Sequence, residues 1–404
     1  MSPKSNLSAC GQTSTNRGAV VRAAIGWYRK NRRSLPWRLT RDPYSIWISE
    51  IMLQQTQVAT VIPYYERFLL RFPDPATLAA ADEEEVYRYW AGLGYYRRAR
   101  QLHTAARRIS EHHSGKFPDT IDDVLALPGI GRYTAQAILS FAFDQRLGIV
   151  EANTQRLYAR LMHWDRPLES TASQKALWGF AESIVPANQC GEFNQAMMEI
   201  GSQICTPKNP SCHDCPLLRF CPTGERGETD RIPAPKAKKV YTDLTEAIVL
   251  VRNTSAQWLV RRCGDSERWS GLYDFPRFDV TESRRPSEIA AKLEQAMREK
   301  FGLDVAIEDA HFSLRHAVTR YRIHLHCFLG DLREEPTAAS GNLIEPGSPR
   351  WLPFDDLHAL AWNASGKRVL KWLGESFPQE SKNHQPIRRT PSSTKTQRPL
   401  GRRN

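Results

Sequence analysis

The stretch LPGIGRYTA, residues 127–135, decides the fold of the first half of this 404-residue chain. Gly129 and Gly131 bracket Ile130, and apolar residues continue at helical spacing on both sides. Glycine takes positive φ at low cost, and a helix that starts after such a turn presents outward-pointing amides that favour an anion. The stretch therefore predicts a helix-hairpin-helix over about residues 119–143, with Ile130 filling the hairpin and a DNA phosphate at the glycines. An ordinary helical hairpin with a glycine turn is the alternative.

The composition supports a polyanionic partner. The formal net charge is +12 and the isoelectric point is about 9.4, which favours nucleic acid over a neutral partner. A basic surface with a basic tail would give the same numbers. No apolar run reaches the ~18–20 residues needed to cross a bilayer, and the N-terminus lacks the apolar segment of a secretory signal. A cytoplasmic protein without a membrane partner is therefore expected.

The residue composition and the expected secondary structure change once, near the middle of the chain. We predict a mainly helical domain over residues 18–225, a Pro- and Lys-rich linker over 226–240 and an α/β domain over 241–375. Residues 1–17 and 376–404 are expected to be disordered tails, the second one basic.

Local patterns add detail to both domains. The longest apolar-periodic stretch, residues 44–72, is expected to break near Pro63. In the second domain, TEAIVLVRN (245–253), QWLVRRC (257–263) and YRIHLHCFLG (321–330) are typical of strands, and residues 286–302 are typical of a helix.

Four of the eight cysteines fall within CTPKNPSCHDCPLLRFC, residues 205–221, with the spacing C-x6-C-x2-C-x5-C. Zinc binds four thiolates in a tetrahedron, and a 4Fe–4S cluster also takes four thiolates. Zinc ribbons use two separated C-x2-C pairs, whereas this loop has one, so the spacing favours one 4Fe–4S cluster over zinc. The ligands would be Cys205, Cys212, Cys215 and Cys221.

Glu50 stands in an otherwise apolar helix, IWISEIMLQQTQ, residues 46–57. If it faces inward, desolvation raises its pKa and makes it a general acid near neutral pH. A glutamate on the helix surface is the alternative. Gln54 and Gln55 beside it are long, neutral and able to donate and accept hydrogen bonds, which suits entry into a base stack.

A second carboxylate, Glu151, opens a helix in GIVEANTQRL, residues 148–157, beside Asn153 and Thr154. Enzymes that cleave glycosidic bonds use two carboxyl groups in different environments. One acts as an acid, and the other stabilises an oxocarbenium-like sugar. From spacing alone, stabilisation of a helix N-terminus is the better explanation of Glu151.

Taken together, these motifs resemble the adenine DNA glycosylase (MutY) family of helix-hairpin-helix, iron–sulfur glycosylases, over roughly residues 20–362. The resemblance rests on LPWR, DPYSIWISEIMLQQTQV, GLGYYRRARQLH, LPGIGRYTAQAIL, FNQAMMEIG and the four-cysteine loop, in this order. It implies a monofunctional, monomeric enzyme of base excision repair in the bacterial cytoplasm, associated with the nucleoid through DNA. Such an enzyme flips adenine opposite 8-oxoguanine or guanine out of double-stranded DNA and hydrolyses its N-glycosidic bond.

The same resemblance assigns roles to individual residues. Glu50 would protonate adenine, Glu151 would be the second carboxylate, and Tyr133 and Asn153 would support the sugar. Contacts with the base or the duplex would come from Trp37, Arg38, Gln54, Gln55, Thr56, Leu93, Tyr95, Gly129, Gly131, Thr319 and Arg320, with Gln55 filling the stack and Tyr95 wedging beside 8-oxoguanine.

Two positions bear on the chemistry. The related endonuclease III-type enzymes have a lysine at the position of Tyr133, and a lysine can form a Schiff base and nick the strand. Tyrosine cannot, so an intact strand with an abasic site is expected. The family's second carboxylate is an aspartate in a DGN context, whereas Glu151 stands in EAN.

The C-terminal domain resembles the family's Nudix-like module through GLYDFPRF (271–278) and PRWLPFDDL (349–357). The family's Phe-Ser-His loop, which reads 8-oxoguanine, corresponds to Val318, Thr319 and Arg320. AMREKFGLDV (296–305) lacks the glutamate pair of a Nudix hydrolase, so we expect a recognition module. Two other functions stay open: a glycosylase for T·G or U·G mispairs, or a weakly catalytic iron–sulfur protein that binds lesions.

Overall fold

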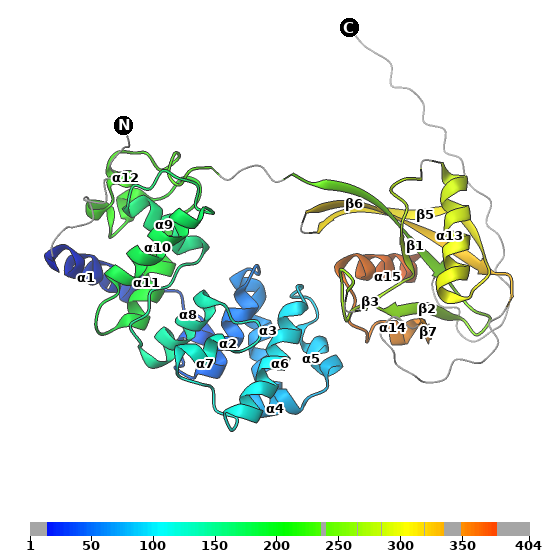
Figure 1. Cartoon of the computed structure of the whole chain (residues 1–404), viewed down its shortest axis with the longest axis horizontal. Helices are drawn as coiled ribbons and strands as arrows, with labels where there is room; N and C mark the ends of the chain where they lie inside the picture. Colours follow the sequence, from blue (N-terminus) through cyan, green and yellow to red (C-terminus); the bar gives the residue numbers. More distant parts are fainter. Residues whose placement is uncertain are drawn as a thin grey trace, which may run out of the picture.

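The computed structural model describes residues 14–235, 240–264, 266–283, 285–318, 320–334 and 349–377. A helical N-terminal domain is followed by an α/β domain, which confirms the predicted fold class (Figure 1). In the described part of the chain, we find no helix with the length and apolarity of a membrane span.

The helical domain is built from short helices joined by tight turns. They are α1 (Ser14–Asn31), η2 (Pro36–Arg38), α2 (Pro43–Leu53), α3 (Val58–Arg71), α4 (Pro75–Ala80), α5 (Glu83–Trp90), α6 (Arg97–His112), α7 (Ile121–Leu125), α8 (Arg132–Phe143), α9 (Ala152–Leu161), α10 (Thr171–Ile184), α11 (Cys190–Gln203), η3 (Cys212–Asp214), η4 (Leu218–Phe220) and α12 (Pro222–Glu225).

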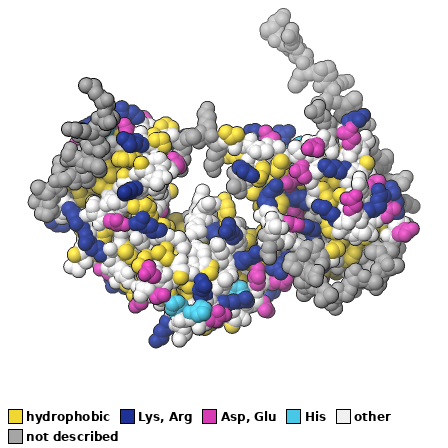
Figure 2. Space-filling model, viewed as in Figure 1, with side chains coloured by type: hydrophobic (Ala, Val, Ile, Leu, Met, Phe, Trp, Pro, Cys, Tyr) yellow, Lys and Arg dark blue, Asp and Glu magenta, His cyan; other side chains and the backbone are white. Residues whose placement is uncertain are grey.

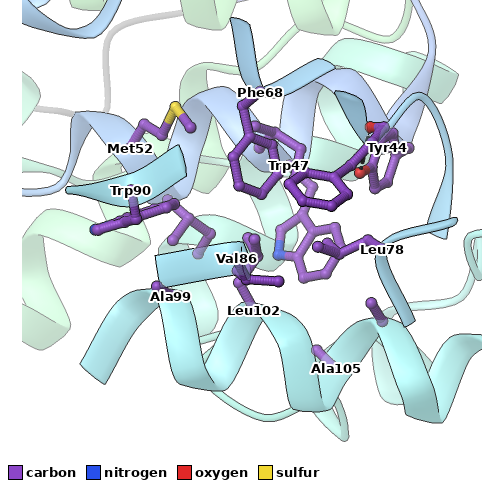
Figure 3. Close-up of a cluster of buried hydrophobic side chains, with 14 of the residues drawn as sticks. Tyr44, Trp47, Met52, Phe68, Leu78, Val86, Trp90, Ala99, Leu102 and Ala105 are labelled. Atoms are coloured by element: carbon purple, nitrogen blue, oxygen red, sulfur yellow. Dashed lines mark hydrogen bonds between the residues drawn. The ribbon is translucent and has the colours of Figure 1, made fainter. Parts of the chain in front are cut away.

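Two separate cores hold this domain. One lies among α2 to α8, where Tyr44, Trp47, Phe68 and Trp90 are all buried (Figure 3). The other joins α1 to α9, α10, α11 and the cysteine loop. Burial of large aromatic side chains is the main stabilising contribution in such cores. The segment between α8 and α9 crosses from one core to the other, so side chains near it can meet from both halves.

The predicted break at Pro63 is wrong. Pro63 lies inside α3, and the chain leaves helical geometry earlier, between α2 and α3 at residues 54–57. Gln55 there has a φ of 57°, which ends the helix. Pro63 is the sixth residue of α3, and it removes only the hydrogen bond that its own amide would have donated, so the helix continues past it.

The domain boundaries also differ from those predicted. Helix α1 begins at Ser14, inside the predicted tail 1–17, because a polar segment can be helical without apolar periodicity. Ile232, in the predicted linker, is fully buried, and its carbonyl accepts a hydrogen bond from Arg160 Nε at 2.9 Å. Residues 226–232 therefore belong to the helical domain. Residues 1–13, 236–239 and 378–404 lie outside the described residues.

The second domain contains β1 (Thr242–Val251), β2 (Gln257–Arg262), β3 (Tyr273–Asp274), β4 (Arg277–Asp279), α13 (Pro286–Phe301), β5 (Val305–Val318), β6 (Tyr321–Leu332), β7 (Pro349–Pro353), α14 (Phe354–Leu357) and α15 (Ala364–Ser376). One sheet has the order β4-β1-β6-β5, with β1 and β6 parallel, and the other has the order β3-β2-β7. Side chains of α13 pack on one face of the larger sheet and side chains of α15 on the other. The strands predicted at β1, β2 and β6 and the helix α13 are confirmed.

The two domains touch directly. Leu272 of the α/β domain is buried in the core formed by α2 to α8, Arg100 NH1 donates to Ser270 Oγ at 2.9 Å, and Arg262 pairs with Glu83 at 3.4 Å. On the face shown in Figure 2, the two domains border an open concave region, and Lys and Arg side chains are spread over both domains. The contact places the β5–β6 hairpin opposite the helical domain (Figure 1).

Candidate active site and nucleic-acid interface

Glu50 is buried on α2, with 5% of its surface exposed. Its Oε2 accepts a hydrogen bond of 2.7 Å from the hydroxyl of Tyr133. Burial raises the pKa of Glu50 to about 7; the Tyr133 hydroxyl and Arg38 oppose this rise, and Glu151 adds to it. The glutamate therefore faces inward, as one of the two sequence hypotheses required, and it can carry a proton at neutral pH.

Tyr133 owes its position to the hairpin. It is the second residue of α8, which starts directly after the glycine turn, so the turn aims its ring at α2. Burial and the nearby carboxylates Glu50 and Glu151 raise the pKa of Tyr133 well above its usual value. The hydroxyl is therefore neutral and acts as a donor.

Glu151 caps the N-terminus of α9. Its Oε1 accepts from the Thr154 amide at 2.8 Å, and its Oε2 accepts from the Asn153 amide at 2.8 Å. The Glu151 amide in turn donates to Thr154 Oγ1 at 2.8 Å, which completes a capping box. Burial raises the pKa of Glu151, and the two backbone amides lower it. Glu151 therefore stabilises the helix N-terminus, as one of its two sequence hypotheses stated, and the cap fixes the carboxylate near Glu50.

Asn153 connects this carboxylate with the cysteine loop. Its Nδ2 donates to Glu151 Oε2 at 3.2 Å, and its Oδ1 accepts from Arg156 NH2 at 3.0 Å. Arg156 Nε also donates to the Cys205 carbonyl at 2.5 Å. A continuous set of hydrogen bonds therefore runs from Glu151 to the first of the four cysteines.

Arg38 is paired with Glu199, a residue that the sequence analysis did not select. Arg38 NH2 donates to Glu199 Oε2 at 2.7 Å, and the nearby Arg33 donates to the same carboxylate. Burial alone would raise the pKa of Glu199, but hydrogen bonds from Arg33 and Arg38 lower it to about 2. Glu199 interrupts the apolar helix sequence FNQAMMEIG much as Glu50 interrupts its own, and that signal could have found it. Trp37, in η2, is buried with its ring 5.4 Å from that of Tyr65.

The hairpin has the predicted shape. Gly129 has a φ of 80°, and Ile130 is buried with 7% exposure, as expected. Gly131 is extended, with a φ of −96°, so it does not use the positive φ that glycine can adopt. Nothing lies within 4 Å of the position that a Gly131 Cβ would take. Among the described residues, no side chain caps the start of α8, so its first backbone amides lack a side-chain partner.

Two loops carry the predicted inserting residues. Gln55 and Tyr95 both have positive φ, and Tyr95 is 60% exposed. Gln54 Nε2 reaches Thr134 Oγ1 at 3.5 Å, at the start of α8. Thr56 Oγ1 donates back to the Gln54 carbonyl at 3.4 Å. Leu93 is only 5% exposed and packs in the core, so in this conformation it supports its loop, and its predicted DNA contact stays a prediction.

The four cysteines of the loop line one small cavity, with Leu157 and Leu161 among the apolar walls. Arg160 NH1 donates to Cys205 Sγ at 3.3 Å, and the Gly224 amide donates to Cys221 Sγ at 3.4 Å. Within the described residues, no group of three or more His, Cys, Asp or Glu side chains forms a site for a metal ion.

The predicted 8-oxoguanine-reading residues fall at the tip of the β5–β6 hairpin. Val318 pairs with Tyr321 across the turn, and Arg320 NH2 donates to the Tyr321 hydroxyl at 2.8 Å. Thr319 lies outside the described residues.

Two family models agree with this architecture. Residues 48–182 match the HhH-GPD superfamily of base excision DNA repair proteins, and residues 247–372 match the NUDIX domain. An adenine DNA glycosylase of Buchnera aphidicola (subsp. Schizaphis graminum) is 38% identical over 257 residues, which are 63% of this chain and 74% of that protein. The human adenine DNA glycosylase is 40% identical over 65% of this chain and 49% of its own length. Among solved structures, a thermostable thymine-DNA glycosylase is 31% identical, with a TM-score of 0.49, and is aligned over 53% of this chain and 100% of its own.

Proposed function

Because the chain belongs to the adenine DNA glycosylase family, enzymes of base excision repair, we propose that it removes adenine mispaired with 8-oxoguanine or guanine from double-stranded DNA. The observation that carries this proposal is the hydrogen bond from Tyr133 to the buried Glu50, whose pKa is raised to about 7. A carboxylic acid that keeps its proton at neutral pH suits the protonation of a departing base.

The two carboxylates have complementary tasks in this reaction. The proton of Glu50 moves to a ring nitrogen of the flipped adenine, and the bond between that base and the sugar carbon breaks. Glu151, held by the amides of Asn153 and Thr154, stabilises the positive charge that develops on the sugar. One water molecule then adds to the sugar carbon and gives a proton to the Glu50 carboxylate, which completes the hydrolysis and restores the acid. Tyr133 has no amine, so no Schiff base forms there and the strand stays intact.

Contacts outside the site would bind and deform the duplex. The uncapped start of α8 would hold a backbone phosphate, which positions the duplex without reading sequence. Gln55 and Tyr95 would enter the base stack, and Arg320 at the β5–β6 tip would approach the base opposite the adenine. Flipping is required because the glycosidic bond is out of reach inside the stack.

We also propose that Cys205, Cys212, Cys215 and Cys221 hold one 4Fe–4S cluster. The residue types fit this group, since the four thiols line one cavity and N–H groups of Arg160 and Gly224 point at two of the sulfurs. Among the described residues, no three of these thiols are already arranged as a metal site, so the loop would have to bring the sulfurs together around the cluster. The cluster would stabilise the loop between α11 and α12. Protein isolated without oxygen is expected to contain about four iron atoms and four acid-labile sulfides per chain, and Cys212→Ser is expected to lower both. About one zinc per chain, without sulfide, would contradict this assignment.

The function is tested by single-turnover base release from a duplex with one A·8-oxoguanine pair, run beside A·G, T·G and U·G duplexes and analysed with and without alkali. Cleavage that requires alkali, in the adenine strand and fastest opposite 8-oxoguanine, is the expected result. Release from T·G or U·G instead would overturn the substrate assignment. Tight binding without release from any duplex would favour a lesion-binding protein.

The pH dependence of base release reports the proton on Glu50. If the protonated form is required, the rate is constant below pH 7 and falls about tenfold per unit above it. Because the Tyr133 hydroxyl lowers the pKa of Glu50, Tyr133→Phe is expected to move this decline to higher pH. Tyr158→Phe is the matched control, since its buried hydroxyl has no hydrogen-bond partner among the described residues. A decline that stays in place or moves to lower pH in Tyr133→Phe would contradict the expectation.

A further inference from the structure

Arg98 is a buried arginine that no step of the proposed reaction uses. It is the second residue of α6, and 8% of its surface is exposed. Its guanidinium donates to the carbonyl oxygens of Ile51 (2.7 Å), Met52 (2.9 Å), Gln54 (2.5 Å), Leu93 (3.2 Å) and Gly94 (3.2 Å), and to Oγ1 of Thr56 (3.2 Å). One side chain therefore satisfies acceptors in two segments that are about forty residues apart in sequence.

These acceptors belong to three functional parts of the domain. Ile51 and Met52 are in the last turn of α2, directly after Glu50. Gln54 and Thr56 flank Gln55, and Leu93 and Gly94 precede Tyr95. The same guanidinium thus contacts the end of the helix that carries the acid and both loops predicted to enter the DNA stack.

The chemistry of these contacts requires arginine. NH1 reaches the acceptors at the end of α2, and NH2 reaches the second loop, so the planar fork spans a gap that one ammonium group would not. The guanidinium also lies 5.3 Å from the ring centre of Trp90 and 5.4 Å from that of Tyr95. A movement of Tyr95 into DNA therefore changes a contact of the group that holds the end of α2.

We propose that Arg98 is a positioning residue that joins the two inserting loops to α2, so that entry of Gln55 and Tyr95 into the stack and alignment of Glu50 occur as one event. This inference rests on the proposed function, because it assigns Arg98 a role in base flipping and not in bond cleavage. The other possibility is that Arg98 only stabilises the fold.

The test uses the full chain with Arg98→Lys, which keeps the charge and loses the fork. Base flipping is followed by the fluorescence rise of 2-aminopurine placed beside the mispaired adenine, and chemistry by single-turnover base release. We expect both to fall about 10- to 100-fold, because a misplacement of about 1 Å has effects of this size. With an adenine that is already unpaired, opposite an abasic site, the loss should shrink to a few-fold, since flipping then costs little.

Arg67→Lys is the matched control. Arg67 also donates to a backbone carbonyl, that of Tyr89 at 2.9 Å, and lies 4.9 Å from the ring centre of Tyr64, yet it touches neither inserting loop. It should leave flipping and release unchanged. Thermal unfolding of each variant separates a loss of folded protein from a loss of function.

The outcomes distinguish the two proposals. Wild-type protein that releases no base overturns the proposed function and the role of Arg98 with it. An active wild type, with Arg98→Lys equally active or impaired to the same extent on paired and unpaired adenine, overturns only the role of Arg98. If Arg98→Lys does not fold, Thr56→Val removes one of the contacts, and a parallel loss of about fivefold in both signals is expected. Unchanged signals in that variant would overturn the role of Arg98.

Discussion

The variant Glu50→Gln is expected to release adenine about 10²- to 10⁴-fold more slowly than the wild type while binding the same duplex with similar affinity. Glutamine keeps the size of the side chain and can still accept the Tyr133 hydroxyl, but it has no acidic proton to give to the base. Single-turnover release and a binding titration at one salt concentration check the two halves of this expectation. Glu66→Gln, at an exposed position of α3, is the matched control. Release by Glu50→Gln at more than a tenth of the wild-type rate would exclude Glu50 as the acid.

The same variant should be more stable than the wild type at neutral pH, although it releases adenine more slowly. Because the pKa of Glu50 is about 7 in the folded protein and 4.5 as its ordinary value, its stabilising protonation is fully present below pH 4.5 and is lost as the pH rises through 7. The difference corresponds to about 3 kcal/mol. Relative to wild type, Glu50→Gln should therefore gain about that much between pH 4.5 and 8 in urea unfolding. No change in the relative stabilities over this range would show that Glu50 is not desolvated.

The second large effect is expected at Glu151. Glu151→Gln removes the charge and should lower the rate of base release about 10²- to 10³-fold, the usual effect of removing one group that stabilises a developing charge. The amide oxygen can still accept from a backbone amide at the start of α9, so the loss of stability should stay near 1 kcal/mol. The measurement is single-turnover release beside thermal unfolding.

Glu151→Asp provides the control for charge and for reach. Aspartate is a favoured helix cap and keeps the charge, but it withdraws the carboxylate by one methylene. We expect a rate within about tenfold of wild type. A loss as large as that of Glu151→Gln would mean that the exact reach of the carboxylate, and not its charge, decides the rate.

Residues near the hairpin were predictable because their signals are local. The two-glycine turn predicted α7 and α8, because this signal depends on a few consecutive residues. The apolar neighbours of Glu50 left a buried and a surface position open, and only the fold shows that the side chain is buried. The strands β1, β2 and β6 were predictable because their signals are also local. Short strands such as β3 and β4 carry too few residues for a pattern, and they form through pairing with β2 and β1.

The missed residues depend on contacts between distant parts of the chain. Glu199 acquires its role because Arg33 and Arg38, more than 160 positions earlier, pair with it in the fold. Arg98 contacts loops from two separate segments, and no pattern of residue spacing predicts such contacts. Gly131 shows a different limit of sequence reasoning. A glycine in a turn indicates either a close approach of other atoms or an unusual φ, and the sequence does not say which.

Because Ile232 is buried, the part of the chain that can fold on its own as the helical domain extends to residue 232 and not only to residue 225. A chain truncated after residue 225 would lose this side chain and the carbonyl oxygens of Thr229 and Ile232, both of which accept from Arg160 beside the cysteine loop. Arg160 would then be left as a buried cation with unsatisfied donors next to Cys205. Protease cleavage that separates the two domains should therefore fall after Ile232. A helical domain produced on its own needs residues 226–232, although their composition is that of a linker.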